Sequence, residues 1–387
     1  MKFNGNNKKM PAFSGDPRAM KIYVESAVPS CPPRHLETEK LRKYFERNGV
    51  KLVDSPSAAG IMVLNTCALL GSLELRVLER IKNLKTFPGK LVVVGCIKYI
   101  NNKALRSIFD GISLAPKELD QIDSFFPEFR YKFSEEGDAC SWAAPHVPGD
   151  FAGDLGKADL SREKHWFVQA SQGCEMKRHC SYCAIWKSTG KYISKPLETC
   201  LEEVRLGGGR KTLHLMDSGA YGTDLGLSFP VLLRAVLHAA GDSGIFLHCL
   251  NPKWVIKHEK ELADMVRGGR IKSIRFAHQS GSDRILRLMN RPYSAKDSLR
   301  CVLALKEACT SLKTITQLMV GFPSETEADF KKTVNLVQEA GFDGLDLFGF
   351  SPRPGTPASV MPGRIDADTV ARRMDVLGRL VGKRRPG

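Results

Sequence analysis

Three cysteines on one short loop offer the clearest chemistry in this sequence. Cys174, Cys180 and Cys183 are spaced C-x5-C-x2-C, and we call this set the loop triad. Three thiolates can bind three irons of a four-iron cluster and leave the fourth iron open to a substrate or cofactor. A structural zinc ion is the alternative, with His179 as the fourth tetrahedral ligand. Because His179 adjoins Cys180 and would need a strained loop, the spacing favours the cluster.

A second set of cysteines is spread over the first hundred residues. Cys31, Cys67 and Cys96, which we call the strand-end triad, each follow an apolar run typical of a buried strand. The carboxyl ends of parallel strands form a ligand crevice, so these three thiols could converge at one edge of a sheet. Converging thiolates suit an iron–sulfur cluster or a soft metal. The alternative is three buried, unreactive cysteines.

Alternating strand and helix patterns must position the strand-end triad. Strands are expected at 22–25, 61–64 and 91–94, and helices at 36–47 and 73–84. Such alternation predicts a parallel α/β sheet, of the flavodoxin-like kind, for the N-terminal part of the chain.

A second alternating series surrounds the loop triad. Its helical patterns lie between six strand patterns, at 166–170, 212–215, 245–250, 274–277, 314–320 and 345–350. Six β/α repeats predict a partial (β/α)6 TIM-like barrel, whose chemistry sits at the carboxyl ends of the strands. The loop triad follows the first of these strands. A last helix is expected from Asp366, a favourable N-cap.

The pattern changes between these two series. The stretch 133–163 carries proline, glycine and aspartate with little periodicity, which is typical of a linker. We therefore expect an N-terminal domain at 20–132 and a second domain at 164–387, which includes a C-terminal helix and a basic tail. Cys140 lies in the expected linker.

Composition limits the class of protein. The chain has 387 residues, 42% of them hydrophobic, which excludes disordered, collagen-like and coiled-coil classes. It lacks both a long apolar run and an N-terminal signal pattern, so we expect a cytoplasmic protein without membrane contact, whose cysteines are thiols. Lysine and arginine number 58 against 42 acidic residues, and the net charge of +16 is compatible with a nucleic-acid partner.

Several short motifs occur in a specific order along the chain. They are Ser30-Cys31 with Glu37-Thr38-Glu39, Leu64-Asn65-Thr66-Cys67-Ala68, Val94-Gly95-Cys96, Gln172-Gly173-Cys174, Cys180-Ser181-Tyr182-Cys183, Gln279-Ser280-Gly281-Ser282, Leu288-Met289-Asn290-Arg291, Val320-Gly321-Phe322-Pro323-Ser324-Glu325-Thr326-Glu327 and Ser351-Pro352-Arg353-Pro354-Gly355-Thr356-Pro357. Each motif is weak alone, but the ordered set is specific. It resembles the radical S-adenosylmethionine (SAM) methylthiotransferases, which modify tRNA or a ribosomal protein.

The resemblance implies a role for each triad. The loop triad would hold a 4Fe-4S cluster that binds SAM, and one electron would release methionine and a 5′-deoxyadenosyl radical. The strand-end triad would hold an auxiliary 4Fe-4S cluster that carries or donates sulfur. The radical would abstract hydrogen from an unreactive carbon, which would capture sulfur, and a second SAM would supply the methyl group. An external one-electron reductant of flavodoxin or ferredoxin type is implied, and we expect a monomer.

Other candidate cofactor contacts lie near the loop triad or after the predicted barrel strands. They are Tyr182, Ile185, Asp217, Ser218, Gln279, Ser280, Gly321 and Phe322. A position at strand ends favours cofactor binding for most of these residues. The alternatives are a core aromatic for Tyr182 and turn capping or chain turning for the others.

Three departures from the family pattern bear on the substrate. The loop triad has two residues more than the usual C-x3-C-x2-C, and the segment 185–191 lacks the usual Pro-Tyr pair. After 351–357 too few residues remain for the small β-barrel domain that binds RNA in this family, so we expect that domain to be absent. These departures favour a peptide or small natural product as substrate. A tRNA base is the alternative substrate, and a zinc-containing nucleic-acid-binding protein is a remote alternative.

Overall fold

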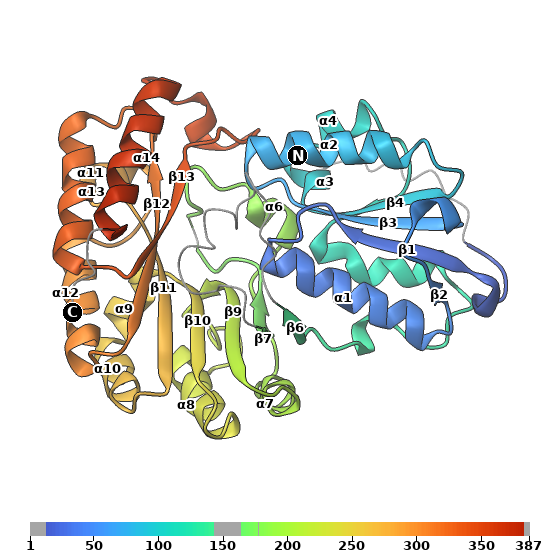
Figure 1. The fold of residues 1–387 in the computed structure, drawn as a ribbon, viewed down its shortest axis with the longest axis horizontal. Helices are drawn as coiled ribbons and strands as arrows, with labels where there is room; N and C mark the ends of the chain where they lie inside the picture. Colours follow the sequence, from blue (N-terminus) through green and yellow to red (C-terminus); the bar gives the residue numbers. More distant parts are fainter. Residues whose placement is uncertain (1–12, 143–163, 177, 383–387) are drawn as a thin grey trace. The chain divides into compact units, whose positions relative to one another are not determined.

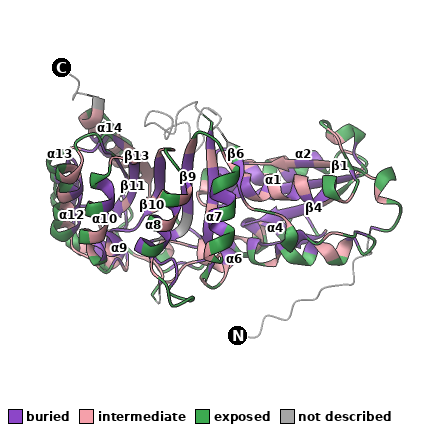
Figure 2. Ribbon diagram, turned by 90° about the horizontal axis from the view of Figure 1, so that it is seen from below, coloured by how far each residue is buried: buried purple, intermediate pink, exposed green. Residues whose placement is uncertain are grey.

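The computed structural model describes residues 13–142, 164–176 and 178–382. The chain forms two compact units, Met1–Asp138 and Ala139–Gly387, which we call the first and second units. In both, the strands are mainly buried and the helices are exposed along one side (Figure 2). No helix in the described ranges is long and apolar enough to cross a membrane.

The first unit is built on a five-stranded sheet in which every strand pair is parallel. The strands are β1 (Lys21–Ser26), β2 (Lys51–Leu52), β3 (Ile61–Thr66), β4 (Lys90–Gly95) and β5 (Ser113–Leu114). Their spatial order is β2-β1-β3-β4-β5, which is the order of flavodoxin-like folds. The expected flavodoxin-like domain is therefore confirmed.

Helices cover both faces of this sheet, with α1 on one face and α2 on the other (Figure 1). The bounds are α1 (Pro32–Arg47), α2 (Gly71–Leu84), α3 (Ile97–Ile100) and α4 (Asn102–Arg106), with 3-10 turns at Pro17–Ala19, Pro56–Ala58, Pro116–Phe125 and Phe133–Glu135. Pro32 and Pro33 suit the start of α1, because the backbone N–H groups of the first helical turn have no acceptor within the helix, so a residue without an N–H loses no hydrogen bond there. Tyr44 of α1 packs tilted and Phe45 edge-on against Phe129, and these rings belong to an apolar core over one face.

The second unit contains an eight-stranded sheet with the order β13-β12-β11-β10-β9-β7-β6, in which β8 pairs with β7. The parallel strands are β7 (His165–Gln172), β9 (Arg210–Ser218), β10 (Ile245–Leu250), β11 (Ile271–Gln279), β12 (Lys313–Val320) and β13 (Gly344–Gly349), and the antiparallel ones are β6 (Cys140–Trp142) and β8 (Ile193–Ser194). This mixed sheet confirms the partial TIM-like barrel. In the stretch expected as a linker, residues 140–142 form β6, and 143–163 lie outside the described residues.

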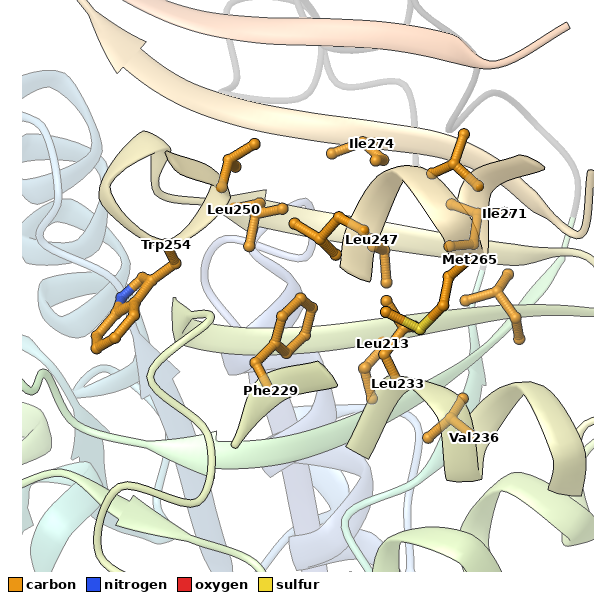
Figure 3. Packing of buried hydrophobic residues seen from close by; sticks show 14 of the residues in the cluster. Leu213, Phe229, Leu233, Val236, Leu247, Leu250, Trp254, Met265, Ile271 and Ile274 are labelled. Atoms are coloured by element: carbon orange, nitrogen blue, oxygen red, sulfur yellow. The ribbon is translucent and has the colours of Figure 1, made fainter. Parts of the chain in front are cut away.

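Helices follow most of the parallel strands. They are α6 (Ile185–Thr189), α7 (Leu197–Leu206), α8 (Phe229–Ala239), α9 (Pro252–Lys257), α10 (Glu259–Arg267), α11 (Asp283–Leu288), α12 (Ala295–Ala308), α13 (Glu327–Ala340) and α14 (Ala367–Gly382), with a 3-10 turn at Pro357–Val360. Leu213, Leu247 and Ile274 on adjacent strands form one apolar cluster with Phe229 and Leu233 of α8 (Figure 3). The backbone N–H of Thr369 donates to Asp366 Oδ1 at 2.7 Å, so α14 begins as the sequence predicts.

Side chains alternate across a strand, so the residues between these apolar ones face the other side of the sheet. Several of them are polar. His214 and His248 share a ring-nitrogen contact of 3.0 Å between β9 and β10. Arg275 and Asp346 form an ion pair that is almost fully buried. The inner side of the barrel sheet is therefore cross-linked by polar pairs rather than filled with aliphatic side chains.

Replacing Phe229 with Ala tests the outer core of the second unit. Phe229 is buried, so the change should lower the free energy of unfolding by about 3–5 kcal/mol, because a large cavity remains. Leu206→Ala is the control, since Leu206 is 76% exposed, and its effect should stay within about 0.5 kcal/mol. Urea unfolding followed by circular dichroism measures both, and equal midpoints for the two variants would contradict this packing.

Candidate cluster and cofactor sites

The strand-end triad lies at the carboxyl edge of the first unit's sheet. Cys67 follows β3 directly, Cys96 follows β4 directly, and Cys31 is the N-cap of α1, between β1 and that helix. The strand order reverses between β1 and β3, and such a switch point is where open α/β sheets bind ligands. Cys67 and Cys96 are buried, and Cys31 is half-buried.

The three thiols influence one another, which shows that they are close together. A hydrogen bond with Cys67 lowers the pKa of Cys31, and the same hydrogen bond, together with burial, raises the pKa of Cys67. Burial raises the pKa of Cys96 to about 12. Each sulfur also accepts a backbone N–H, from Arg34 at Cys31, from Leu69 at Cys67 and from Ala68 at Cys96. Hydrogen bonds to the ligand sulfurs are a feature by which proteins tune iron–sulfur clusters.

The loop triad follows β7 in the second unit. Cys174 Sγ lies 3.9 Å from Asp217 Oδ2, and the backbone N–H of Cys183 donates to the Cys180 carbonyl at 3.0 Å. Burial, with a smaller effect of Asp217, raises the pKa of Cys174, and burial raises that of Cys183 to about 11. Met176 N–H donates to the Cys174 sulfur.

The other two sulfurs of the loop triad also meet donors. Ile185 and Trp186, at the start of α6, donate their backbone N–H groups to Cys183. Arg291 donates from Nη1 to Cys180 Sγ at 3.4 Å. The predicted contact residue Ile185 therefore acts through its main chain on a cysteine. The contact of Arg291 with Cys180 was not predicted. Arg291 belongs to the motif Leu288-Met289-Asn290-Arg291, but a motif does not reveal which thiol its arginine reaches.

In the described residues, neither triad brings its thiols around a single metal atom. In the ranges 13–142, 164–176 and 178–382, no group of three or more histidine, cysteine, aspartate or glutamate side chains is arranged to hold a metal ion. Zinc–sulfur bonds of about 2.3 Å require all thiolates to meet around one atom. In a cluster the thiolates bind different irons, so they are spaced further apart.

The longer cysteine loop is braced from two sides. Ser181 donates its N–H to the Met289 carbonyl at 3.1 Å and its hydroxyl to the Leu288 carbonyl at 2.7 Å. The His179 ring stacks on Trp186 with centroids 4.3 Å apart, and its carbonyl accepts from Asn290 at 3.0 Å. His179, the suggested zinc ligand, thus stacks on an aromatic ring.

Tyr182 and Phe322 lie together in a small apolar cluster beside this loop. Phe322 is fully buried, and the cluster also contains residues of α11, β12 and the final 3-10 turn. Tyr182 is partly buried and packs against this cluster. Its placement matches the core-aromatic alternative and leaves adenine contact a prediction.

Asp217 connects the cysteine loop with α9. Its Oδ2 accepts the Glu175 N–H at 3.3 Å, and its Oδ1 accepts the Trp254 indole N–H at 3.2 Å. Burial raises the pKa of Asp217. Ser218 ends β9, and its side chain lies outside the described residues.

Gln279 and Ser280 lie where β11 ends. Gln279 has φ +71°, an unusual conformation for a residue with a side chain, and it is buried. Cys249, near the end of β10, and Ser324, after β12, also have positive φ. Such strained residues often gather at binding sites. The Ser280 hydroxyl accepts the Ser282 N–H at 3.1 Å, which is the turn-capping role that the sequence left open.

Gly321 is the first residue after β12 and lies against Val370 of α14. Its φ is +75°, and a Cβ there would lie 2.4 Å from Val370 Cγ2, so a side chain does not fit. Its N–H donates to Glu325 Oε2 at 2.8 Å, and the same oxygen accepts from Arg373 Nη1 at 2.7 Å. The last helix therefore holds this loop through a buried ion pair, which the sequence did not predict.

Comparison with known proteins decides the family. Residues 168–337 match the Radical SAM superfamily, and residues 21–115 match "Uncharacterized protein family UPF0004". The threonylcarbamoyladenosine tRNA methylthiotransferase MtaB of Thermotoga maritima is 30% identical over 359 residues, which cover 90% of this chain and 79% of that protein. The chain belongs to the radical SAM methylthiotransferase family. As a member, it is an enzyme that inserts sulfur as a methylthio group and uses SAM and iron–sulfur chemistry.

Other relatives of this radical SAM methylthiotransferase agree. The tRNA-2-methylthio-N(6)-dimethylallyladenosine synthase of Thermodesulfovibrio yellowstonii is 29% identical over 369 residues, covering 91% of this chain and 81% of that protein. Among solved structures, the cobalamin-dependent radical SAM enzyme OxsB with aqua-cobalamin and SAM bound matches with a TM-score of 0.53 at 12% identity. That match covers 93% of this chain and 56% of OxsB, and it shows a shared fold alone.

Removing Arg373 tests the link between α14 and the loop after β12. Arg373→Leu leaves the buried Glu325 carboxylate unpaired, which should lower the free energy of unfolding by about 3–5 kcal/mol. Arg372→Leu is the matched control, because Arg372 pairs with Glu327 at the surface, where an ion pair contributes at most about 1 kcal/mol. Urea unfolding measures both, and a loss no larger for Arg373→Leu than for the control would contradict the role of the pair.

Proposed function

We propose that this enzyme methylthiolates an N6-modified adenosine in tRNA. The observation that carries this proposal is its sequence similarity, over nine tenths of the chain, to enzymes named for such adenosines in tRNA. The net charge of +16 also supports a polyanionic substrate, since phosphate contacts by lysine and arginine dominate nucleic-acid affinity.

This proposal replaces the peptide or small natural product that the sequence departures favoured. Those departures concern loop length, one segment and the end of the chain, and none of them identifies a substrate chemically. The longer cysteine loop is accommodated by His179 stacking on Trp186 and by backbone contacts of Ser181. The tRNA alternative therefore becomes the main interpretation.

We assign one 4Fe-4S cluster to each triad, the SAM-binding cluster to the loop triad and the auxiliary cluster to the strand-end triad. When bound, SAM and the two clusters supply the one-electron chemistry and the sulfur that convert C–H into C–S–CH3. Six cysteines in two sets, with donors directed at their sulfurs, support this assignment. The electron would come from an external one-electron reductant.

The residues around the loop triad prepare the site before the cofactor binds. Asp217 fixes the Glu175 backbone and the Trp254 indole, which orients the segment that carries Cys174. Arg291 is positioned by its bond with Tyr293 (Nε to Oη, 3.1 Å) and donates to Cys180. Burial of these groups keeps water away from the cluster, which protects reactive species from side reactions.

Anaerobic turnover tests the substrate assignment. Reconstituted enzyme, SAM, a chemical reductant and tRNA carrying threonylcarbamoyladenosine should give a nucleoside heavier by one sulfur plus one CH2, measured by mass spectrometry after digestion. tRNA carrying dimethylallyladenosine is run in parallel to distinguish the two N6 substituents. If neither tRNA gains this mass while SAM is still cleaved, the tRNA assignment is wrong.

Cysteine replacements test the division of labour between the triads. Alanine at Cys174, Cys180 and Cys183 should abolish 5′-deoxyadenosine formation, because SAM loses its cluster. Alanine at the strand-end triad should leave SAM cleavage measurable and stop sulfur insertion. Cys309→Ala is the control, because this half-exposed thiol belongs to neither triad, and it should retain both activities. Sulfur insertion by the strand-end variant would refute the auxiliary-cluster assignment.

A further inference from the structure

An arginine side chain is buried beside the strand-end triad. Arg34 lies in the first turn of α1, three residues after Cys31, and is only 3% exposed. Its Nη2 binds Glu37 Oε1 at 2.6 Å, and among the described residues its buried Nη1 has no hydrogen-bond partner. A buried guanidinium normally uses all of its donors, since an unpaired polar group costs stability. The free donor therefore suggests that a further group binds here.

The surrounding residues fix the position of Arg34. Asn65 Nδ2 on β3 donates to the Arg34 carbonyl at 3.0 Å and lies 3.2 Å from Glu37 Oε2. The Thr38 hydroxyl donates to the same carbonyl at 2.7 Å. Asn65 thus anchors the first turns of α1 to the strand that leads to Cys67. The arginine and its partner carboxylate are held as a pair with little freedom.

The positive member of this pair lies beside the thiols. An arginine guanidinium stays protonated in proteins. Arg34 is close enough to interact electrostatically with Cys31, Cys67 and Cys96, and its backbone N–H donates to the Cys31 sulfur. A fixed positive charge therefore lies next to the strand-end triad.

We propose that Arg34 is a positioning residue that raises the reduction potential of the auxiliary cluster by offsetting its negative charge and donating from Nη1 to its anionic ligand shell. The proposal rests on the assignment of that cluster to the strand-end triad. A cluster held by three thiolates would carry a net negative charge in a buried site, and one-electron reduction would make it more negative by one charge. A fixed cation stabilises the reduced, more negative state more than the oxidised one, and net charge and hydrogen bonds to sulfur set such potentials.

The test isolates the auxiliary cluster. Cys174, Cys180 and Cys183 are changed to Ala together, so that any iron–sulfur signal comes from the strand-end triad. In this background Arg34→Gln, Arg34→Lys and Glu37→Gln are titrated with dithionite and followed by electron paramagnetic resonance. Iron and acid-labile sulfide are measured in each sample. The control is Arg47→Gln, at the other end of α1, where Arg47 pairs with Glu136 on the surface.

Arg34→Gln should shift the midpoint potential to more negative values, and Glu37→Gln should shift it to more positive values. Arg34→Lys should remain near the potential of the background, because it keeps the charge, and Arg47→Gln should not change it. If Arg34→Gln loses the cluster, restoration by Arg34→Lys supports the proposal and failure of that restoration overturns it. A cluster in Arg34→Gln with unchanged potential also overturns it.

The outcome separates this inference from the proposed function. If the background itself contains no iron after reconstitution, the strand-end triad holds no cluster, and the assignment on which the inference rests is wrong. If the background holds a full cluster and only the effect of Arg34 is absent, the cluster assignment stands and the arginine inference alone is wrong.

Discussion

A thiolate that leaves water loses its hydration, and something in the protein must replace it. In this chain six thiols in two triads are buried or half-buried, and each has a donor directed at its sulfur. For five of the six thiols the donor is one backbone N–H group or two. These groups belong to residues that follow the same cysteine or another cysteine of its triad. The backbone next to each of these cysteines therefore follows a path that directs N–H groups at the sulfur. The strands, the start of α1 and the hydrogen bonds of the cysteine loop stabilise that path.

Cys180 differs from the other five thiols, because its donor is the side chain of Arg291. A side chain can move away where a backbone group cannot. The barrel supports Arg291 through Tyr293, whose hydroxyl donates to the His278 carbonyl at 2.6 Å. The His278 ring packs against Phe276 and Phe342 of the outer core and lies 2.8 Å from the Thr316 hydroxyl of β12, so the contact at one cysteine depends on how neighbouring barrel strands pack.

The sequence was sufficient for the fold class and the family, because both depend on local signals. Apolar runs ending in cysteine predicted β3 and β4, and Asp366 predicted the start of α14. The polar connections around the site were beyond reach. Arg291 and Cys180 are 111 residues apart, and Arg373 and Glu325 are 48 apart, so their contacts are set by tertiary packing alone. β6 was missed because a three-residue strand has no periodicity of its own.

Val370 on α14 packs against two glycines, Gly321 and Gly349, and this packing restricts which side chains the three positions accept. Gly321 and Gly349, after β12 and at the end of β13, leave the space that this one valine occupies, with would-be Cβ atoms 2.4 and 3.1 Å from its methyl groups. The side chains that fit at 349 and 370 are therefore coupled. A shorter side chain at 370 would admit alanine at 349, whereas 321 would remain glycine because its backbone is left-handed. Among homologues, the residues at 349 and 370 would therefore be expected to covary.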